Sequence, residues 1–222
     1  MANGIKTLFL PGPAGKLEAL LNEGQPDATH AALVCHPHPL FGGTMHNKVV
    51  FHAMKTLHSF GFPVLRFNFR GAGLSEGQHD HGRGEVEDVR AALNWLDSEF
   101  HLPILFCGFS FGAATGLRAS CADDRVAGLI SLGTPVAVEG RAYTYQFLQS
   151  CTKPKLFVSG ANDQYSPQTN LRGLYEMVPG PKELVFVEGA DHFFEGHLAT
   201  LQQAIHHWVQ EFFKPGRQAE AS

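Results

Sequence analysis

The sequence predicts an α/β protein whose mostly parallel, twisted sheet has about eight strands, with helices on both faces. Strand-like and helix-like hydrophobic patterns alternate along the chain, which favours this class. The later strand segments are continuously apolar, as is typical of parallel strands buried on both sides. With 222 residues, 44% of them hydrophobic, and no internal repeat or linker, the chain fits a single domain. We expect that domain at residues 1–213, followed by a flexible tail at 214–222.

Short apolar runs bounded by turn residues mark the strands. The first two are joined by a turn rich in proline and glycine, and the third stops at Pro37. The expected strands span 5–10, 17–21, 31–36, 63–69, 104–107, 126–132, 155–160 and 184–188.

Apolar residues at helical spacing mark the segments between the strands. In the first such segment, Val50, Met54 and Leu57 fall on one face. Between residues 136 and 150 the spacing allows a small helix at most, so we expect no full cap domain. The expected helices span 47–60, 86–96, 111–121, 167–177 and 197–213.

Charge and cysteine content narrow the possible partners. The net charge is −4 and the basic residues are scattered, so neither nucleic acid nor a membrane is expected as a partner. No segment reads as a signal peptide or a membrane span, which favours a cytoplasmic location. Without a C-x-x-C pair, we expect reduced, buried thiols and no metal or cofactor. Both a monomer and a homodimer remain open. The four cysteines are Cys35, Cys107, Cys121 and Cys151.

The most informative motif is the G-x-S-x-G pentapeptide at residues 108–112. It follows the apolar run 104–107 and precedes a predicted helix. A sharp strand-to-helix turn presents the central serine at the end of a sheet. Ser110 is therefore the candidate nucleophile, and it requires a general base and an acidic partner elsewhere in the chain.

The search for those partners can be confined to residues that follow strands, because open α/β sheets bind ligands beyond the carboxyl ends of their strands. Asp163 follows the strand at 155–160, and His192 follows the strand at 184–188. The chain order Ser110, Asp163, His192 is the order of an α/β catalytic triad. We predict that His192 is the base and that Asp163 orients it.

Other histidines and aspartates fit these roles less well. Histidines within or at the start of the last helix do not follow a strand, and two others precede the serine. An aspartate adjacent to His192 cannot easily turn back to its ring, and two more follow the helix after the serine. The residues set aside on these grounds are His36, His38, His197, His206, His207, Asp123, Asp124 and Asp191.

Taken together, these motifs resemble the α/β-hydrolase superfamily over nearly the whole chain. The segments 36–45 and 66–73 are similar to those of a small bacterial subgroup related to dienelactone hydrolases. Dienelactone hydrolases use a cysteine nucleophile, whereas this chain has Ser110. The resemblance therefore implies a serine esterase-like enzyme with the single-domain α/β-hydrolase fold, and it argues against the dehalogenase branch, which needs an aspartate there.

The resemblance also implies where an oxyanion hole would lie. One donor would be the amide of Phe111, directly after the nucleophile, and the other would come from the loop after the third strand. His38 carries the matching amide. Pro37 and Pro39 have no N–H, so Leu40 is the alternative donor.

The expected substrate is a small soluble ester. Phe41 and Phe194 are candidates for an apolar substrate pocket beside the triad. Metal binding by His36 and His38 is disfavoured because no third ligand has suitable spacing. Two other functions stay open: a peptidase or amidase with the same triad, and a hydrolase scaffold that serves only as a binding module.

Overall fold

The computed structural model describes residues 4–141 and 143–213. Its sheet has eight strands in the order β1-β2-β4-β3-β5-β6-β7-β8. The predicted tail at 214–222 lies outside the described residues. The strands are β1 (Ile5–Gly12), β2 (Gly15–Asn22), β3 (Ala31–Cys35), β4 (Val64–Phe67), β5 (Ile104–Phe109), β6 (Val126–Leu132), β7 (Lys155–Gly160) and β8 (Lys182–Val187).

Strand direction divides the sheet into two parts. The hairpin β1–β2 is antiparallel, and β2 also pairs with β4 in antiparallel register. From β4 to β8 all neighbouring strands are parallel. The carboxyl ends of these parallel strands therefore meet at one edge, where a site can form.

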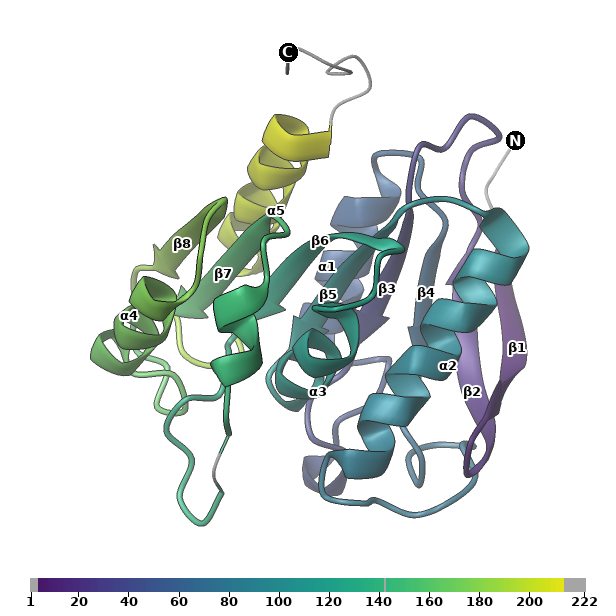
Figure 1. Ribbon diagram of the computed structural model, residues 1–222, viewed down its shortest axis with the longest axis horizontal. Helices are drawn as coiled ribbons and strands as arrows, with labels where there is room; N and C mark the ends of the chain where they lie inside the picture. Colours follow the sequence, from purple (N-terminus) through teal and green to yellow (C-terminus); the bar gives the residue numbers. More distant parts are fainter. Residues whose placement is uncertain (1–3, 142, 214–222) are drawn as a thin grey trace.

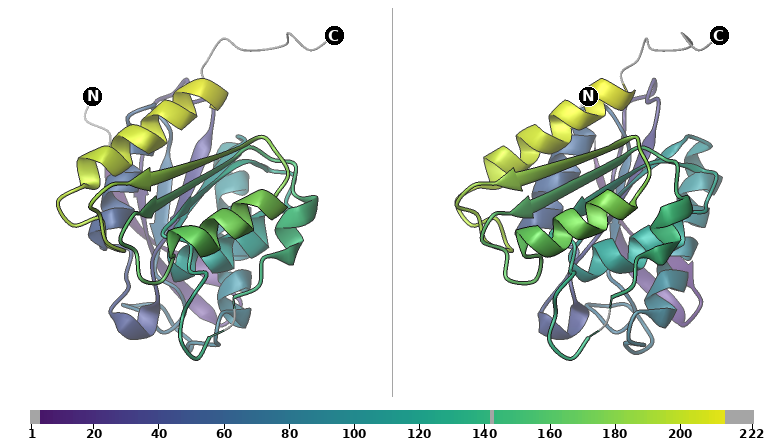
Figure 2. Two further views of the ribbon diagram at one scale, coloured as in Figure 1. Left: turned by 90° about the vertical axis from the view of Figure 1, so that its left-hand side faces the viewer. Right: turned by 60° about the vertical axis from the view of Figure 1, so that its left-hand side comes forward.

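Helices cover both faces of the sheet, as predicted (Figures 1 and 2). α2, α3 and α4 lie on one face, and α1 and α5 lie on the other. The helices are α1 (Lys48–His58), α2 (Arg83–Phe100), α3 (Phe111–Ser120), α4 (Gln168–Met177) and α5 (Leu198–Phe213), with short 3-10 turns η1 (Pro39–Phe41) and η2 (Gln146–Ser150).

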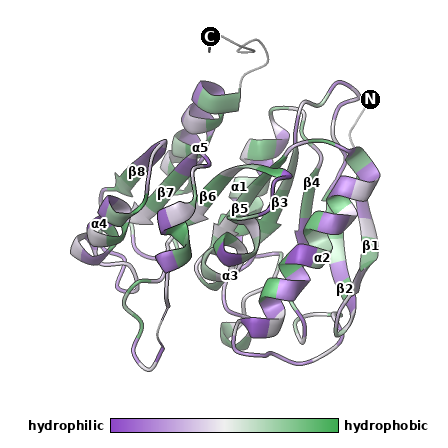
Figure 3. Cartoon of the chain, in the orientation of Figure 1, coloured by the Kyte–Doolittle hydropathy of each residue, from purple (hydrophilic) through white to green (hydrophobic). Residues whose placement is uncertain are grey.

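Two apolar clusters, one on each face of the sheet, form the core. The first joins the sheet to α2, α3 and α4, and the second joins it to α1 and α5. Hydrophobic residues accordingly concentrate along the central strands, whereas α2 alternates in polarity (Figure 3). Burial on both faces explains why the parallel strands read as unbroken apolar runs in the sequence.

The connection between β6 and β7 contains one regular element, the short η2, within its described residues. The expectation that the fold has no full cap domain is thus confirmed. None of the helices in the described ranges is long and apolar enough to cross a membrane.

The expected burial of the cysteines holds for Cys35, Cys107 and Cys151, which are buried free thiols. The expectation that the thiols are buried is wrong for Cys121, which is only half-buried. Cys121 follows the last residue of α3, where the helix approaches the surface.

Candidate active site

Ser110 occupies the sharp turn between β5 and α3. Its backbone has φ 55° and ψ −119°, a left-handed conformation that is uncommon for a residue with a side chain. Its N–H donates to the carbonyl of Leu132 at 2.9 Å. The turn is thereby held between β5 and β6, with the hydroxyl at the carboxyl edge of the sheet.

Glycine is required on both sides of this turn because backbones approach closely there. A Cβ at Gly112 would lie 2.4 Å from the carbonyl oxygen of His36, and one at Gly108 would lie 2.5 Å from the oxygen of Gly112. The first turn of α3 therefore packs directly against the end of β3.

The structure brings Ser110, Asp163 and His192 together from the ends of β5, β7 and β8. His192 Nε2 lies 2.9 Å from Ser110 Oγ, and His192 Nδ1 lies 2.8 Å from Asp163 Oδ2. An ionised carboxylate only accepts hydrogen bonds, so Nδ1 carries the proton. Nε2 is then free to accept the proton of the serine hydroxyl.

Asp163 is held by several donors besides His192. Its Oδ1 accepts from the backbone N–H groups of Tyr165 and Ser166, at 2.9 and 3.1 Å. Its Oδ2 also accepts from the Ser159 hydroxyl at 3.2 Å. Both oxygens of this buried carboxylate therefore accept hydrogen bonds from protein donors, and these bonds fix its orientation toward His192.

The imidazole of His192 is enclosed by aromatic side chains. The ring centroids of Phe109 and Tyr165 lie 5.0 and 4.8 Å from its own. Phe109 is fully buried. These contacts restrict rotation of the imidazole, so the two hydrogen bonds keep a single geometry.

The backbone N–H groups of Phe111 and His38 have no acceptor among the described residues, and His38 lines the same pocket as Ser110. The alternative donor, the N–H of Leu40, already donates to His38 Nδ1 at 3.2 Å. The geometry thus favours His38 over Leu40 as the second free donor. Phe111 also begins α3, whose N-terminal end favours developing negative charge.

Both histidines after β3 are neutral at ordinary pH. Burial lowers the pKa of His36 to about 4, and burial followed by the charge of Arg141 lowers the pKa of His38 to about 4. His36 accepts the N–H of Phe69 at Nε2, and its Nδ1 lies 2.6 Å from the carbonyl oxygen of Pro37. His36 is therefore a fixed structural element beneath the loop that carries His38.

A pocket of about 210 Å³ opens over Ser110 and His192. Phe41 lines it with 76% of its surface exposed. The prediction of Phe194 as a pocket residue is wrong, because its side chain is fully buried in the core that contacts α5. A left-handed φ of 54° at Phe194 turns the chain there. Its neighbour Phe193, 49% exposed, lines the pocket instead.

The family model described as "Alpha/beta hydrolase domain" matches residues 31–214 of this chain. The chain belongs to the α/β hydrolases. This assignment confirms the resemblance that the sequence motifs indicate. Together with the eight-stranded sheet, it establishes the single-domain hydrolase fold.

Two solved structures resemble this α/β hydrolase over nearly its whole length. An alpha-beta serine hydrolase homologue from Coxiella burnetii is 38% identical, covers 91% of this chain and 96% of its own, and gives a TM-score of 0.82. A Xanthomonas campestris protein described as an a/b serine hydrolase without lid is 33% identical, covers 95% and 96%, and gives a TM-score of 0.85. An uncharacterised Rickettsia prowazekii protein is 33% identical over 90% of this chain and 91% of its own.

Sequence reasoning missed several residues that line the pocket of this hydrolase. Arg141 and Tyr143 come from the connection between β6 and β7, whose spacing allows a small helix but does not indicate which of its side chains face the pocket. Asn47 caps α1, where its side chain accepts the N–H of Val49 at 2.9 Å. It also lines the pocket.

Within residues 4–141 and 143–213, no three His, Cys, Asp or Glu side chains gather closely enough to hold a metal ion. His36, one of the two histidines considered for that role, has both ring nitrogens in contact with backbone groups.

Proposed function

We propose that this hydrolase cleaves carboxylic esters through an acyl-enzyme formed on Ser110. The observation that carries the proposal is the unbroken hydrogen-bonded chain from Ser110 Oγ through His192 to Asp163. His192 takes the serine proton as the oxygen attacks the ester carbonyl, and Asp163 stabilises the resulting imidazolium.

The oxyanion formed by this attack needs donors that are already in place. The free amides of Phe111 and His38 supply them, and the N-terminal end of α3 adds favourable charge. His192 then gives its proton to the departing alcohol. A water molecule repeats the attack on the acyl-enzyme, with His192 again as base, and releases the carboxylic acid and free Ser110.

Small, soluble esters suit the dimensions of the site. The pocket over Ser110 measures about 210 Å³, and an exposed aromatic side chain, Phe41, borders it. The words "serine hydrolase" in the descriptions of the Coxiella and Xanthomonas structures support the same reaction class.

A direct test combines covalent labelling with a comparison of substrates. We expect a fluorophosphonate probe to label Ser110, and p-nitrophenyl acetate to be hydrolysed while the matching p-nitroanilide is not. Faster cleavage of the anilide would instead assign a peptidase or amidase. Absence of both labelling and hydrolysis in the folded protein would leave only a binding role for the scaffold.

A further inference from the structure

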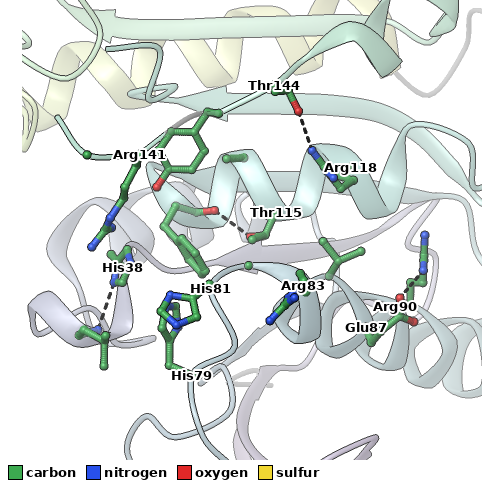
Figure 4. Close-up of a pocket in the computed structure, with 17 residues that line it drawn as sticks. His38, His79, His81, Arg83, Glu87, Arg90, Thr115, Arg118, Arg141 and Thr144 are labelled. Carbon is green, nitrogen blue, oxygen red and sulfur yellow. Dashed lines mark hydrogen bonds and ion pairs between the residues drawn. The ribbon is translucent and has the colours of Figure 1, made fainter. Parts of the chain in front are cut away.

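A second and larger pocket of about 680 Å³ lies between α2 and α3, beside the pocket over Ser110 (Figure 4). The two pockets share three lining residues, His38, Arg141 and Tyr143. Because these residues border both pockets, the two pockets adjoin each other, and we call the larger one the α2–α3 groove. A substrate with its carbonyl at Ser110 can therefore extend into this groove.

One wall of the groove is a single face of α3. Phe111, Thr115 and Arg118 line it at successive helical turns. Phe111 is also the residue whose amide lies beside Ser110. A rise of about 1.5 Å per residue places Arg118 about 10 Å farther along the helix axis than Phe111.

The facing wall comes from α2 and is also rich in arginine. Arg83 and Arg90 line it, but each has a carboxylate partner. Arg83 pairs with Asp80 at 3.1 Å, and Arg90 pairs with Glu87 (Figure 4). The carboxylate of Asp80 also accepts the N–H of Gly84 in the first turn of α2, so it binds both this N–H and Arg83.

Arg118 and Arg141 have no carboxylate partner within the described ranges. Arg118 donates to the hydroxyl of Thr144 at 2.9 Å, and Arg141 lies over the ring of Phe41 at 5.0 Å. Both side chains are exposed. Four arginines and one acidic residue, Glu87, line the α2–α3 groove, so it carries excess positive charge in a chain of net charge −4.

We propose that the α2–α3 groove binds an anionic group, a carboxylate or a phosphate, carried by the ester substrate at a distance from the scissile bond. Arg118 is the principal ligand, and Arg141 guides the anion where the two pockets meet. Guanidinium groups are well suited to this task because they bind either anion through paired N–H donors. The inference rests on the proposed esterase function and specifies its substrate class.

The substrate test compares matched pairs of esters of graded chain length. One member ends in a carboxylate, and the other has a primary amide in its place. A second series ends in a phosphate, which distinguishes the two anions. Both series are made with the terminal group on the acyl side and on the alcohol side. We expect at least one anionic ester to exceed its neutral partner about 10-fold in kcat/KM, with a preference that falls as salt is added.

The variant test uses Arg118→Gln, with Arg172→Gln as the matched control. Arg172 is an exposed arginine on α4 that lies over Phe186 and lines neither pocket. Arg118→Gln should remove most of the anionic preference through a higher KM, whereas Arg172→Gln should keep it. The proposal is overturned if no anionic ester is preferred, or if both variants retain the same preference.

Binding can be measured apart from catalysis in a Ser110→Ala background. Calorimetry with the anionic esters of both series should show, for at least one of them, about 10-fold weaker binding when Arg118→Gln is added. If the unmodified protein hydrolyses none of the esters but Arg118→Gln still weakens binding, the esterase proposal is refuted and the anion site is retained. Equal binding by the two proteins would refute the anion site, whatever the activity.

Discussion

The imidazole of His36 accepts the backbone N–H of Phe69 at 3.0 Å, joining the chain after β3 to the chain after β4. Nε2 must be unprotonated to accept this bond, and the imidazole is fully buried. Acid therefore breaks a contact directly beneath the loop that carries His38.

This contact gives a pH-dependent stability with a definite sign. Burial lowers the pKa of His36 from 6.5 to about 4, so the unfolded chain binds the proton more readily than the folded one. The contribution of His36 to the free energy of unfolding is fully present above pH 6.5. It falls by about 3 kcal/mol as the pH drops toward 4. Urea unfolding at several pH values should show that His36→Gln flattens this slope. An unchanged slope would contradict the assignment.

Replacing the nucleophile is the most direct test of the proposed chemistry. Ser110→Ala should lower esterase kcat by at least ~10³-fold and abolish fluorophosphonate labelling, because no other hydroxyl is hydrogen-bonded to His192 in the described structure. Ser98→Ala, which alters an exposed hydroxyl on α2, serves as the control. Near-normal turnover in Ser110→Ala would remove Ser110 from the mechanism.

The role of Asp163 can be separated from that of its neighbour Asp191. Asp163→Asn should lower kcat by ~10³–10⁴-fold, since an amide can favour the wrong tautomer of His192. The carboxylate of Asp191 accepts instead from the N–H groups of Phe193 and Glu195, at 3.0 and 3.1 Å. Asp191→Asn should therefore have a much smaller effect on kcat, and steady-state kinetics of both variants would decide between the two aspartates.

Two glycines in helices should respond oppositely to alanine. Gly112→Ala places a Cβ 2.4 Å from the carbonyl oxygen of His36, which should cost about 1–3 kcal/mol or prevent folding. At Gly173 in α4 the new Cβ would meet nothing within 4 Å. Gly173→Ala should raise the free energy of unfolding by about 0.5–1 kcal/mol, because alanine favours helix more than glycine does. Chemical denaturation of both variants measures the contrast.

Much of the fold could be predicted from the sequence because strands and helices are marked by patterns within short segments of the chain. Apolar runs bounded by turns predicted all eight strands. The G-x-S-x-G motif selected Ser110, and the rule that sites form beyond the carboxyl ends of parallel strands selected Asp163 and His192. In the structure, His192 lies within hydrogen-bonding distance of both Ser110 and Asp163.

The residues around the triad were harder to predict because their positions depend on irregular backbone. Phe194 has a left-handed backbone conformation, and its side chain points into the core while that of Phe193 points toward the pocket. No periodic pattern in the sequence indicates this turn. Arg141 and Tyr143 lie in a connection without regular secondary structure near them. The Leu40 N–H is already used in a hydrogen bond to a side chain, which only coordinates reveal.

The missing cap domain has a kinetic consequence. In the described connection between β6 and β7, η2 is the one regular element, so no folded module has to swing aside before an ester reaches Ser110 or a product leaves. Enzymes with closing elements are often limited by the opening motion. Here the turnover rate should be set by bond making and breaking at the serine, and adding a viscogen such as sucrose should leave kcat nearly unchanged.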